Sequence, residues 1–360
     1  MAKPRSNIVD ENVTPWYHCI SRCVRREPLC GGKHAYRKQW IERRLEELGA
    51  VFSIECAGFS VMDNHMHLLL RLDSPLAAQW SAEEVARRWL GLFPLRDSDG
   101  KALAVSEARI RRFAEDPDWV SKMRKRLADL GWYMKCLKEP IARRANREDD
   151  VSGAFWEGRY KSIAVLDEAS LLATAAYIDL NPLAAGVAPT PEKSEHTSLR
   201  VRLDHCDLNG SIPTLREDRS NLSRNDTQEA GLWLLPLDDN RADGAVRPGL
   251  MPGCTLSFYL GVVDASSRMV RDGKASLGPG VQPIFQRLAL KQSAVEATFA
   301  KLFNRRDRIA NSLGSKIGRS DGRPLARPRR VDTTESERGT SIFRHEDLTG
   351  VLAASGNVQA

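Results

Sequence analysis

The nine residues HMHLLLRLD (65–73) decide the fold, because an aliphatic run that ends at a turn former is typical of a strand buried in a sheet. The segment VFSIECAGFSVM (51–62) predicts a second strand just before it, and the Asp-Asn pair between the two is a turn former. Side chains alternate between the two faces of a strand. His65 and His67 therefore share one face, and Met66 points to the core.

The upstream segments complete the predicted sheet. Residues 15–24 (PWYHCISRCV) predict a strand, which two glycines at 31–32 interrupt. Residues 33–49 predict a helix that ends at a glycine, a residue common at helix C-termini. The order strand, helix, strand, strand predicts an α+β fold with an antiparallel, ferredoxin-like split βαβ sheet.

Helices dominate the next hundred residues. A Ser followed three residues later by a Glu predicts a capped helix over 81–93. The basic stretch 120–148 predicts a long helix, which Pro140 is expected to kink or split. After a predicted strand at 155–166, the Ala/Leu-rich stretch 166–186 predicts a helix capped by its Asp.

The composition changes after about residue 190, where polar and turn-forming residues become frequent. Four parts are predicted: a main α+β domain over 1–195, a polar linker over 196–250, a small helical module over 251–310, and a basic to polar tail over 311–360, which is expected to be disordered.

Charge and composition restrict the class of protein. The chain has 360 residues, of which 42% are hydrophobic and 28% charged, so wholesale disorder is excluded. A net charge of +7 fits a polyanionic partner. No apolar run approaches the roughly 18 residues of a membrane helix, and the start lacks the apolar core of a signal peptide. We therefore expect a cytoplasmic protein with no membrane partner.

The seven cysteines show no C-x-x-C spacing. A disulfide framework or a zinc ribbon is therefore not expected, and the cysteines are interpreted as small buried residues.

The histidine pair is the sharpest chemical feature. Because His65 and His67 stand at i and i+2 on a strand, they aim two imidazoles at one point, which makes a partial site for a divalent metal. The alternative is a chance histidine beside a structural one.

Tyr177 and Asn181 stand at i and i+4 on the predicted helix, so their side chains are neighbours. Taken alone, such a pair is ordinary on a helix. Beside a metal held by the histidines, the Asn181 carbonyl is a candidate third ligand and the Tyr177 hydroxyl a candidate nucleophile for phosphodiester transfer.

Several segments together resemble a known family, the HUH single-strand DNA endonucleases, and in particular the REP-associated tyrosine transposases. The match covers roughly residues 14–200, and a looser likeness extends to 255–274. The segments are WYHCISRCVRR (16–26), MDNHMHLLL (62–70), EPIARRANRE (139–148), FWEGRYKS (155–162) and AAYIDLNPLAAGV (175–187).

The resemblance implies an HUH endonuclease core. His65 and His67 would be metal ligands, Asn181 the third ligand, and Tyr177 the nucleophile. It further implies Mg²⁺ or Mn²⁺, no small-molecule cofactor, and cleavage of single-stranded or hairpin DNA that leaves a 5′-phosphotyrosine and a free 3′-OH. The family often works as a dimer, although REP-associated members can act as monomers. The small pair Ala184-Ala185 stands where many members carry a basic residue.

Basic residues suggest where DNA would bind. Those at i and i+4 on a helix share a face that could follow phosphates; the alternative is a merely solvated face. The candidates are Arg143, Arg144, Arg147, Arg159 and Lys161.

Two further functions fit the same residues. One is a DNA- or RNA-binding regulator that keeps the fold but does not cut. The other is a metal phosphodiesterase that uses water, which would stay active when Tyr177 is replaced by Phe.

Overall fold

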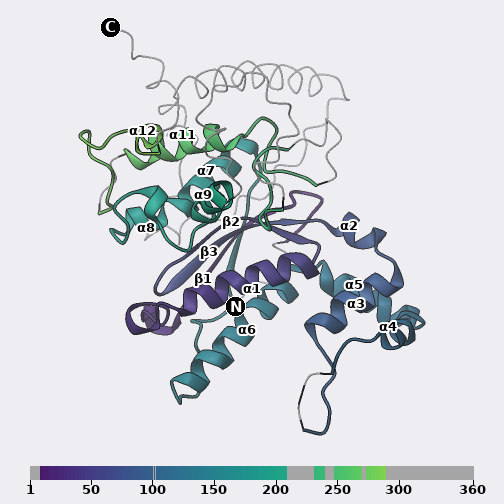
Figure 1. Ribbon diagram of the computed structural model, residues 1–360. Coiled ribbons are helices and arrows are strands. Elements are labelled where there is room, and N and C mark those ends of the chain that lie inside the picture. Colours follow the sequence, from purple (N-terminus) through teal and green to yellow (C-terminus); the bar gives the residue numbers. More distant parts are fainter. Residues whose placement is uncertain are drawn as a thin grey trace, which may run out of the picture.

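A four-stranded antiparallel sheet lies at the centre of the described part of the chain, with the strand order β2-β3-β1-β4 (Figure 1). The computed structural model describes residues 9–99, 101, 103–208, 231–239, 247–269 and 273–288. The strands are β1 (Trp16–Arg22), β2 (Ile54–Val61), β3 (His65–Leu72) and β4 (Lys161–Ala164).

The predicted split βαβ unit is present. Helix α1 (Arg37–Val51) connects β1 to β2, and β3 lies between these two strands. Both pair antiparallel with β3, so β1 and β2 run parallel to each other. The prediction of an α+β fold with an antiparallel sheet is confirmed.

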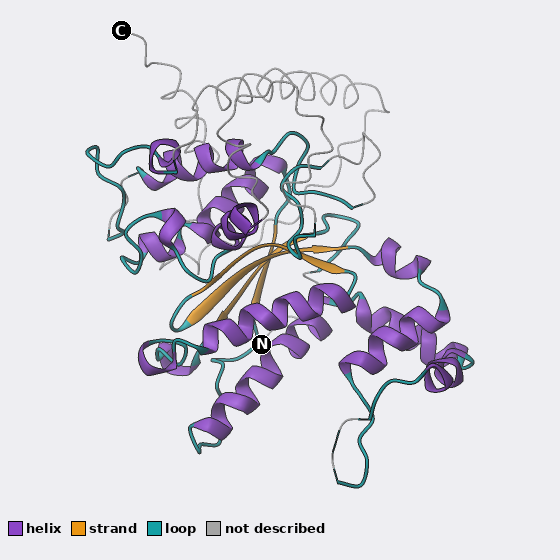
Figure 2. Ribbon diagram, in the orientation of Figure 1, coloured by secondary structure: helices purple, strands orange, loops and turns teal. Residues whose placement is uncertain are grey.

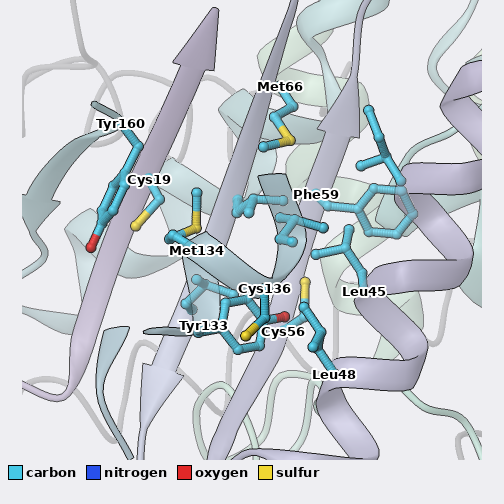
Figure 3. Packing of buried hydrophobic residues seen from close by; sticks show 14 of the residues in the cluster. Cys19, Leu45, Leu48, Cys56, Phe59, Met66, Tyr133, Met134, Cys136 and Tyr160 are labelled. Carbon is cyan, nitrogen blue, oxygen red and sulfur yellow. The ribbon is translucent and has the colours of Figure 1, made fainter. Parts of the chain in front are cut away.

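Helices cover both faces of the sheet (Figure 2). On one face, α1 and α6 (Leu130–Glu148) enclose an apolar layer. Its members include Leu45 of α1, Met66 of β3 and Tyr133 of α6, all buried (Figure 3). We call this the apolar face of the sheet.

The opposite face is covered by helices from the later part of the chain (Figure 1). Asp167 caps the first of them by accepting a hydrogen bond from the Ser170 amide at 2.8 Å, as predicted. The helix predicted over 166–186 is two helices, because Pro182 lacks the amide hydrogen needed to continue the first. These helices are α7 (Glu168–Asp179), α8 (Asn181–Ala184), α9 (Ser198–Leu208), α11 (Leu256–Ser267) and α12 (Ile284–Arg287).

A smaller helical group extends from the edge of the sheet. Ser81 caps α3 by accepting from the Glu84 amide at 3.1 Å, as the capping pattern predicts. The helices of this group are α2 (Ser74–Gln79), α3 (Ala82–Leu92), α4 (Glu107–Ala114) and α5 (Pro117–Leu127). Three-residue 3-10 turns lie at Val24–Arg26, Gly32–His34 and Pro191–Lys193.

The predicted split of the helix at Pro140 is wrong, because α6 is one helix over Leu130–Glu148. Helix α6 continues through Pro140, and the break in the stretch 120–148 lies earlier, where Asp129 caps α6. A proline leaves the carbonyl four residues before it without its helical partner. Here that carbonyl belongs to Cys136 and accepts from Arg44 Nε at 3.1 Å, so the helix loses little.

The strand predicted over 155–166 is shorter, at Lys161–Ala164. The preceding residues lie against α6, where Trp156 Nε1 donates to the Lys138 carbonyl at 3.0 Å and Lys138 Nζ donates to the Gly158 carbonyl at 2.9 Å. The segment also bonds to the end of β1, where the Glu157 amide donates to the Arg22 carbonyl at 2.9 Å and Trp156 forms an isolated bridge with Cys23.

The described parts of the predicted linker and helical module share one apolar cluster with α7. Leu199, Leu235 and Val263 are fully buried in this cluster together with Ile178. These parts of 196–250 are therefore packed, not solvated. The domain boundaries stay a prediction, and the tail over 311–360 lies outside the described residues.

All seven cysteines lie in the described part of the chain, where they are buried and form no disulfide bond, as interpreted from the sequence. Within the described ranges, no helix has both the length and the apolar character needed to cross a membrane.

Candidate active site

The two histidines of β3 lie on the sheet face opposite the apolar one. His65 pairs with Arg22 of β1, and His67 pairs with Ile20. Paired residues of an antiparallel sheet point to the same side, so this face, which we call the histidine face, also carries Arg22. It lies under α7, whereas Met66 is buried in the apolar layer. The alternation predicted from the sequence is confirmed.

Tyr177 reaches this face from α7. The ring centroids of His67 and Tyr177 are 5.5 Å apart and meet edge to face, and those of His65 and His67 are 5.0 Å apart. Asn181, the first residue of α8, makes a side-chain hydrogen bond with His65. The structure thus brings all four predicted site residues together, while their catalytic and metal-binding roles stay a prediction.

The Nδ1 atom of His65 already has a hydrogen-bond partner. Its Nδ1 lies 2.6 Å from Asn64 Oδ1. Asn64 Nδ2 donates to the Arg26 carbonyl at 2.9 Å, which orients the amide with its oxygen toward His65. An amide oxygen can only accept, so His65 carries its proton on Nδ1 and presents the lone pair of Nε2.

A third histidine, which the sequence did not single out, lies beside the pair. His18 of β1 is 3% exposed, and its Nε2 is 2.9 Å from Nδ1 of His67. The two rings meet edge to edge through these nitrogens, with centroids 5.1 Å apart and 27° between their planes, and the rings of His18 and Tyr177 lie edge to face at 6.1 Å. Finding it requires the pairing register of two strands about 50 residues apart in the sequence.

Burial keeps the imidazoles neutral at pH 7. Desolvation lowers the pKa of His18 to about 4. It also lowers the pKa of His65 to about 4, with a further contribution from the charge of Arg22, while the hydrogen bond with Asn181 opposes the shift. The pKa of His67 lies well below its usual value, first from burial and then from the neighbouring histidines. Neutral imidazole is the form that binds a metal.

The donor set fits a divalent ion. Among the described residues, no three His, Cys, Asp or Glu side chains are placed to hold a metal. The candidate set is instead two neutral imidazoles and the Asn181 amide. The imidazole nitrogens are ligands that transition-metal ions favour, and the amide oxygen is a ligand that suits Mn²⁺ and Mg²⁺.

The basic groups near the pair include one predicted residue, Lys161, and two that were not predicted. Arg22 lies opposite His65 in the sheet, and Lys161 lies opposite Ile20, so both belong to the histidine face. Lys274 is also close enough to lower the pKa of His65. Arg22 and Lys274 each lie in a segment that carries the resemblance, yet the sequence analysis did not single either of them out as a contact residue.

The predicted arginines of α6 lie on the other side of the sheet. Arg143 forms an ion pair with Glu139, and Arg144 stacks on Trp40 of α1 at 3.7 Å. Arg147 is exposed on the same helix, and Arg159 is exposed in the loop before β4. The structure therefore does not bring Arg143, Arg144 and Arg147 together with the histidine pair.

The end of α7 is held by a buried carboxylate. Asp179 is 1% exposed, and its two oxygens accept from Ser198 Oγ at 2.6 Å, the Leu199 amide at 2.8 Å and Tyr259 Oη at 2.5 Å. Asp179 stands between Tyr177 and Asn181 in the sequence, so these donors fix the segment that carries both.

Comparison with known proteins gives little guidance. No protein-family model matches the chain, and no curated protein matches it. A solved structure of a REP-associated tyrosine transposase bound to a REP hairpin aligns at 12% identity, over 52% of this chain and 78% of that chain, with a TM-score of 0.27. A TM-score this low does not establish a shared fold. Membership in that family stays a prediction, and the functional argument rests on the geometry above.

Proposed function

We propose that this protein is a metal-dependent single-stranded DNA endonuclease and strand transferase that acts through Tyr177. The observation that carries the proposal is the convergence of Tyr177, His65, His67 and Asn181 on one face of the sheet. A phenol held against two neutral imidazoles and an amide combines a nucleophile with a metal site, and phosphodiester transfer requires both.

His65, His67 and Asn181 would hold Mn²⁺ or Mg²⁺, with each imidazole using Nε2. A bound divalent ion polarises a phosphoryl oxygen and offsets the charge that grows on it in the transition state. Tyr177 is half-buried beside this set, so part of its side chain is accessible from solvent.

The proposed reaction is a transesterification. The Tyr177 oxygen attacks the scissile phosphorus, a new O–P bond forms, and the bond from phosphorus to the 3′-oxygen breaks. The tyrosine proton passes to solvent, and the departing 3′-oxygen takes a proton to become a free hydroxyl. Because a phenol has a pKa near about 10, phenolate can leave again when a DNA 3′-OH attacks the phosphotyrosine. Strand transfer is the result.

Positive charge near the site supports a nucleic acid as the substrate. The chain carries a net charge of +7, and Arg22 and Lys161 lie on the histidine face. Such groups attract phosphates without reading sequence. We propose single-stranded or hairpin DNA as the substrate, with the scissile phosphate between these cations and Tyr177.

The test is formation of a covalent protein–DNA adduct. Labelled single-stranded hairpin DNA from the flanks of the protein's own gene would be incubated with the protein and Mn²⁺, then run on a denaturing gel. The variants are Tyr177→Phe and a matched control, Tyr36→Phe, whose ring is 44% exposed and hydrogen-bonded to Glu148.

We expect an adduct with the wild type and with Tyr36→Phe, and none with Tyr177→Phe. Cleavage that survives Tyr177→Phe without an adduct would indicate a phosphodiesterase that uses water. Binding with neither cleavage nor adduct would indicate a regulator that does not cut.

A further inference from the structure

The two candidate metal ligands are held in the same way. Nδ1 of His65 lies 2.6 Å from Asn64 Oδ1, and Nδ1 of His67 lies 2.9 Å from His18 Nε2. In both rings the Nδ1 side is occupied by a protein group, and Nε2 is the nitrogen left for another partner. Histidines that bind metals commonly show this pattern, in which a neighbour fixes the ring and its tautomer.

The contact between His18 and His67 contains one hydrogen, and its position decides whether His67 can bind a metal. If His18 Nε2 is the donor, neutral His67 carries its own hydrogen on Nε2 and has no lone pair there. If His67 Nδ1 is the donor, Nε2 of His67 is free, and His18 accepts through Nε2. Only the second arrangement presents a ligand.

We propose that His18 is a positioning residue that accepts the Nδ1–H of His67 and thereby holds Nε2 of His67 ready for a divalent cation. The inference rests on the proposed function, because it assumes a metal at the histidine pair. It assigns a role to a residue that neither the sequence pattern nor the four predicted site residues supply.

The surroundings of His18 favour this role over a loose contact. His18 and His67 are 3% and 2% exposed, so water does not readily replace either partner. The rings are nearly coplanar, with 27° between their planes and centroids 5.1 Å apart, so the two nitrogens point at each other from the adjacent strands β1 and β3. A partner on a packed strand holds its orientation better than one on a loop.

The geometry also distinguishes the positioning role of His18 from a role as a metal ligand. Its Nε2 is directed at Nδ1 of His67, so that nitrogen is not aimed at the point where His65 and Asn181 meet. A role as a further metal ligand is therefore an outcome of the test and not the proposal.

The experiment measures Mn²⁺ binding by calorimetry on the full chain, without DNA. His18→Leu removes the acceptor and keeps an apolar side chain of similar size. His18→Gln places an amide oxygen near the position of Nε2 and can accept the same hydrogen. Ile20→Val, a conservative change on the same strand and the same face, is the control.

We expect His18→Leu to weaken Mn²⁺ affinity about 10- to 100-fold, the usual effect of losing such a partner. His18→Gln should stay within a few-fold of the wild type. Unchanged affinity in His18→Leu would overturn the proposal. A loss in His18→Gln as large as that in His67→Ala would also overturn it, and would indicate that His18 is itself a ligand.

A second measurement does not depend on the variants folding. In the wild type labelled with ¹⁵N-histidine and loaded with the diamagnetic ion Mg²⁺ or Zn²⁺, the imidazole spectrum reports where each proton lies. We expect the His67 proton on Nδ1, and a proton on Nε2 would refute the proposal. If the wild type binds no metal, the proposed metal site fails as well. If it binds metal and cuts DNA while His18→Leu matches it, only the inference about His18 falls.

Discussion

The two faces of strand β3 show how one segment serves both packing and chemistry. On the apolar face, Met66, Leu68 and Leu70 are each completely buried against α1 and α6. On the histidine face, the alternating positions hold His65 and His67 under α7. The first face uses side chains that fill space, and the second uses side chains that need defined partners. The apolar face therefore holds the strand rigid, and this rigidity lets the histidine face hold its rings in one orientation.

Substitutions of the adjacent residues Met66 and His67 test most directly whether the two faces have separate roles. Met66→Ala should lower the free energy of unfolding by about 2–5 kcal/mol, because it leaves a cavity in the core. His67→Ala should lower it less, by about 1–3 kcal/mol, through loss of the hydrogen bond with His18. It should also abolish Mn²⁺ binding. Urea unfolding and calorimetry on each variant measure the two quantities.

At temperatures where Met66→Ala is folded, its Mn²⁺ affinity should equal that of the wild type. If Met66→Ala lost metal binding while staying folded, the two faces would not be separable in the way described.

Acid should affect the two faces differently. On the apolar face, burial raises the pKa of Cys56 to about 12 and that of Tyr133 well above its usual value, so neither titrates in acid. On the histidine face, the folded-state pKa of His18 is about 4, below its ordinary 6.5. Between pH 6.5 and 4 the unfolded chain therefore binds a proton that the folded chain does not.

The free energy of unfolding should fall as the pH is lowered through that window, by on the order of 3 kcal/mol for His18 alone. Urea unfolding at pH 7 and at pH 4.5, with a chelator present, measures the loss. His18→Gln carries no titrating group at this position, so its loss should be smaller than that of the wild type. Equal losses in the two proteins would contradict the shift assigned to His18.

Two buried tyrosines, one on each side of the sheet, differ in their hydrogen bonding in the same way. Tyr259 Oη donates to Asp179 on the histidine side of the sheet, whereas Tyr133 Oη, on the apolar side, has no hydrogen-bond partner among the described residues. Tyr259→Phe should cost about 1.5–3 kcal/mol, the value of a hydrogen bond to a charged group. Tyr133→Phe should be nearly neutral. Denaturant midpoints measure both, and equal costs would show that ring packing alone matters.

The smallest effect concerns the cations. Arg22 belongs to the histidine face, and Arg143 belongs to α6 beyond the apolar face, where it pairs with Glu139. If DNA follows the histidine face, Arg22→Ala should reduce the slope of log affinity against log salt by about one. Arg143→Ala should leave the slope unchanged. Fluorescence anisotropy over a salt series with a labelled hairpin gives both slopes, and the reverse result would place the DNA on α6.

Local patterns in the sequence were enough to predict the strands of the split βαβ unit, the Asp167 cap, the shared face of His65 and His67, and the shared helix face of Tyr177 and Asn181. Each depends on alternation or on i to i+4 spacing, which is set within a few residues. The missed features depend on distant partners. His18 reaches His67 only through the register of β1 and β3. Pro140 lies inside α6, and Arg44 of another helix donates to the Cys136 carbonyl, which the proline leaves without its helical donor.

The packing of the described residues within 198–208, 231–239 and 247–267 was missed for the same kind of reason. The sequence between 191 and 250 is polar on average, yet Leu199 and Leu235 are fully buried, and Ser198 lies at the buried Asp179 carboxylate. Average composition does not report which few side chains meet a buried group on another element.

The hydrogen bond from Tyr259 to Asp179 also sets an order of events during synthesis. The ribosome makes the chain from the N-terminus, so the histidines and Tyr177 emerge first, and the last of the three donors to Asp179 follows 80 residues later. Until then the carboxylate at the end of α7 lacks its third donor, and the apolar cluster shared with α11 is incomplete. A growing chain, or one that stops before Tyr259, would thus contain every proposed active-site residue without the support that fixes them in place.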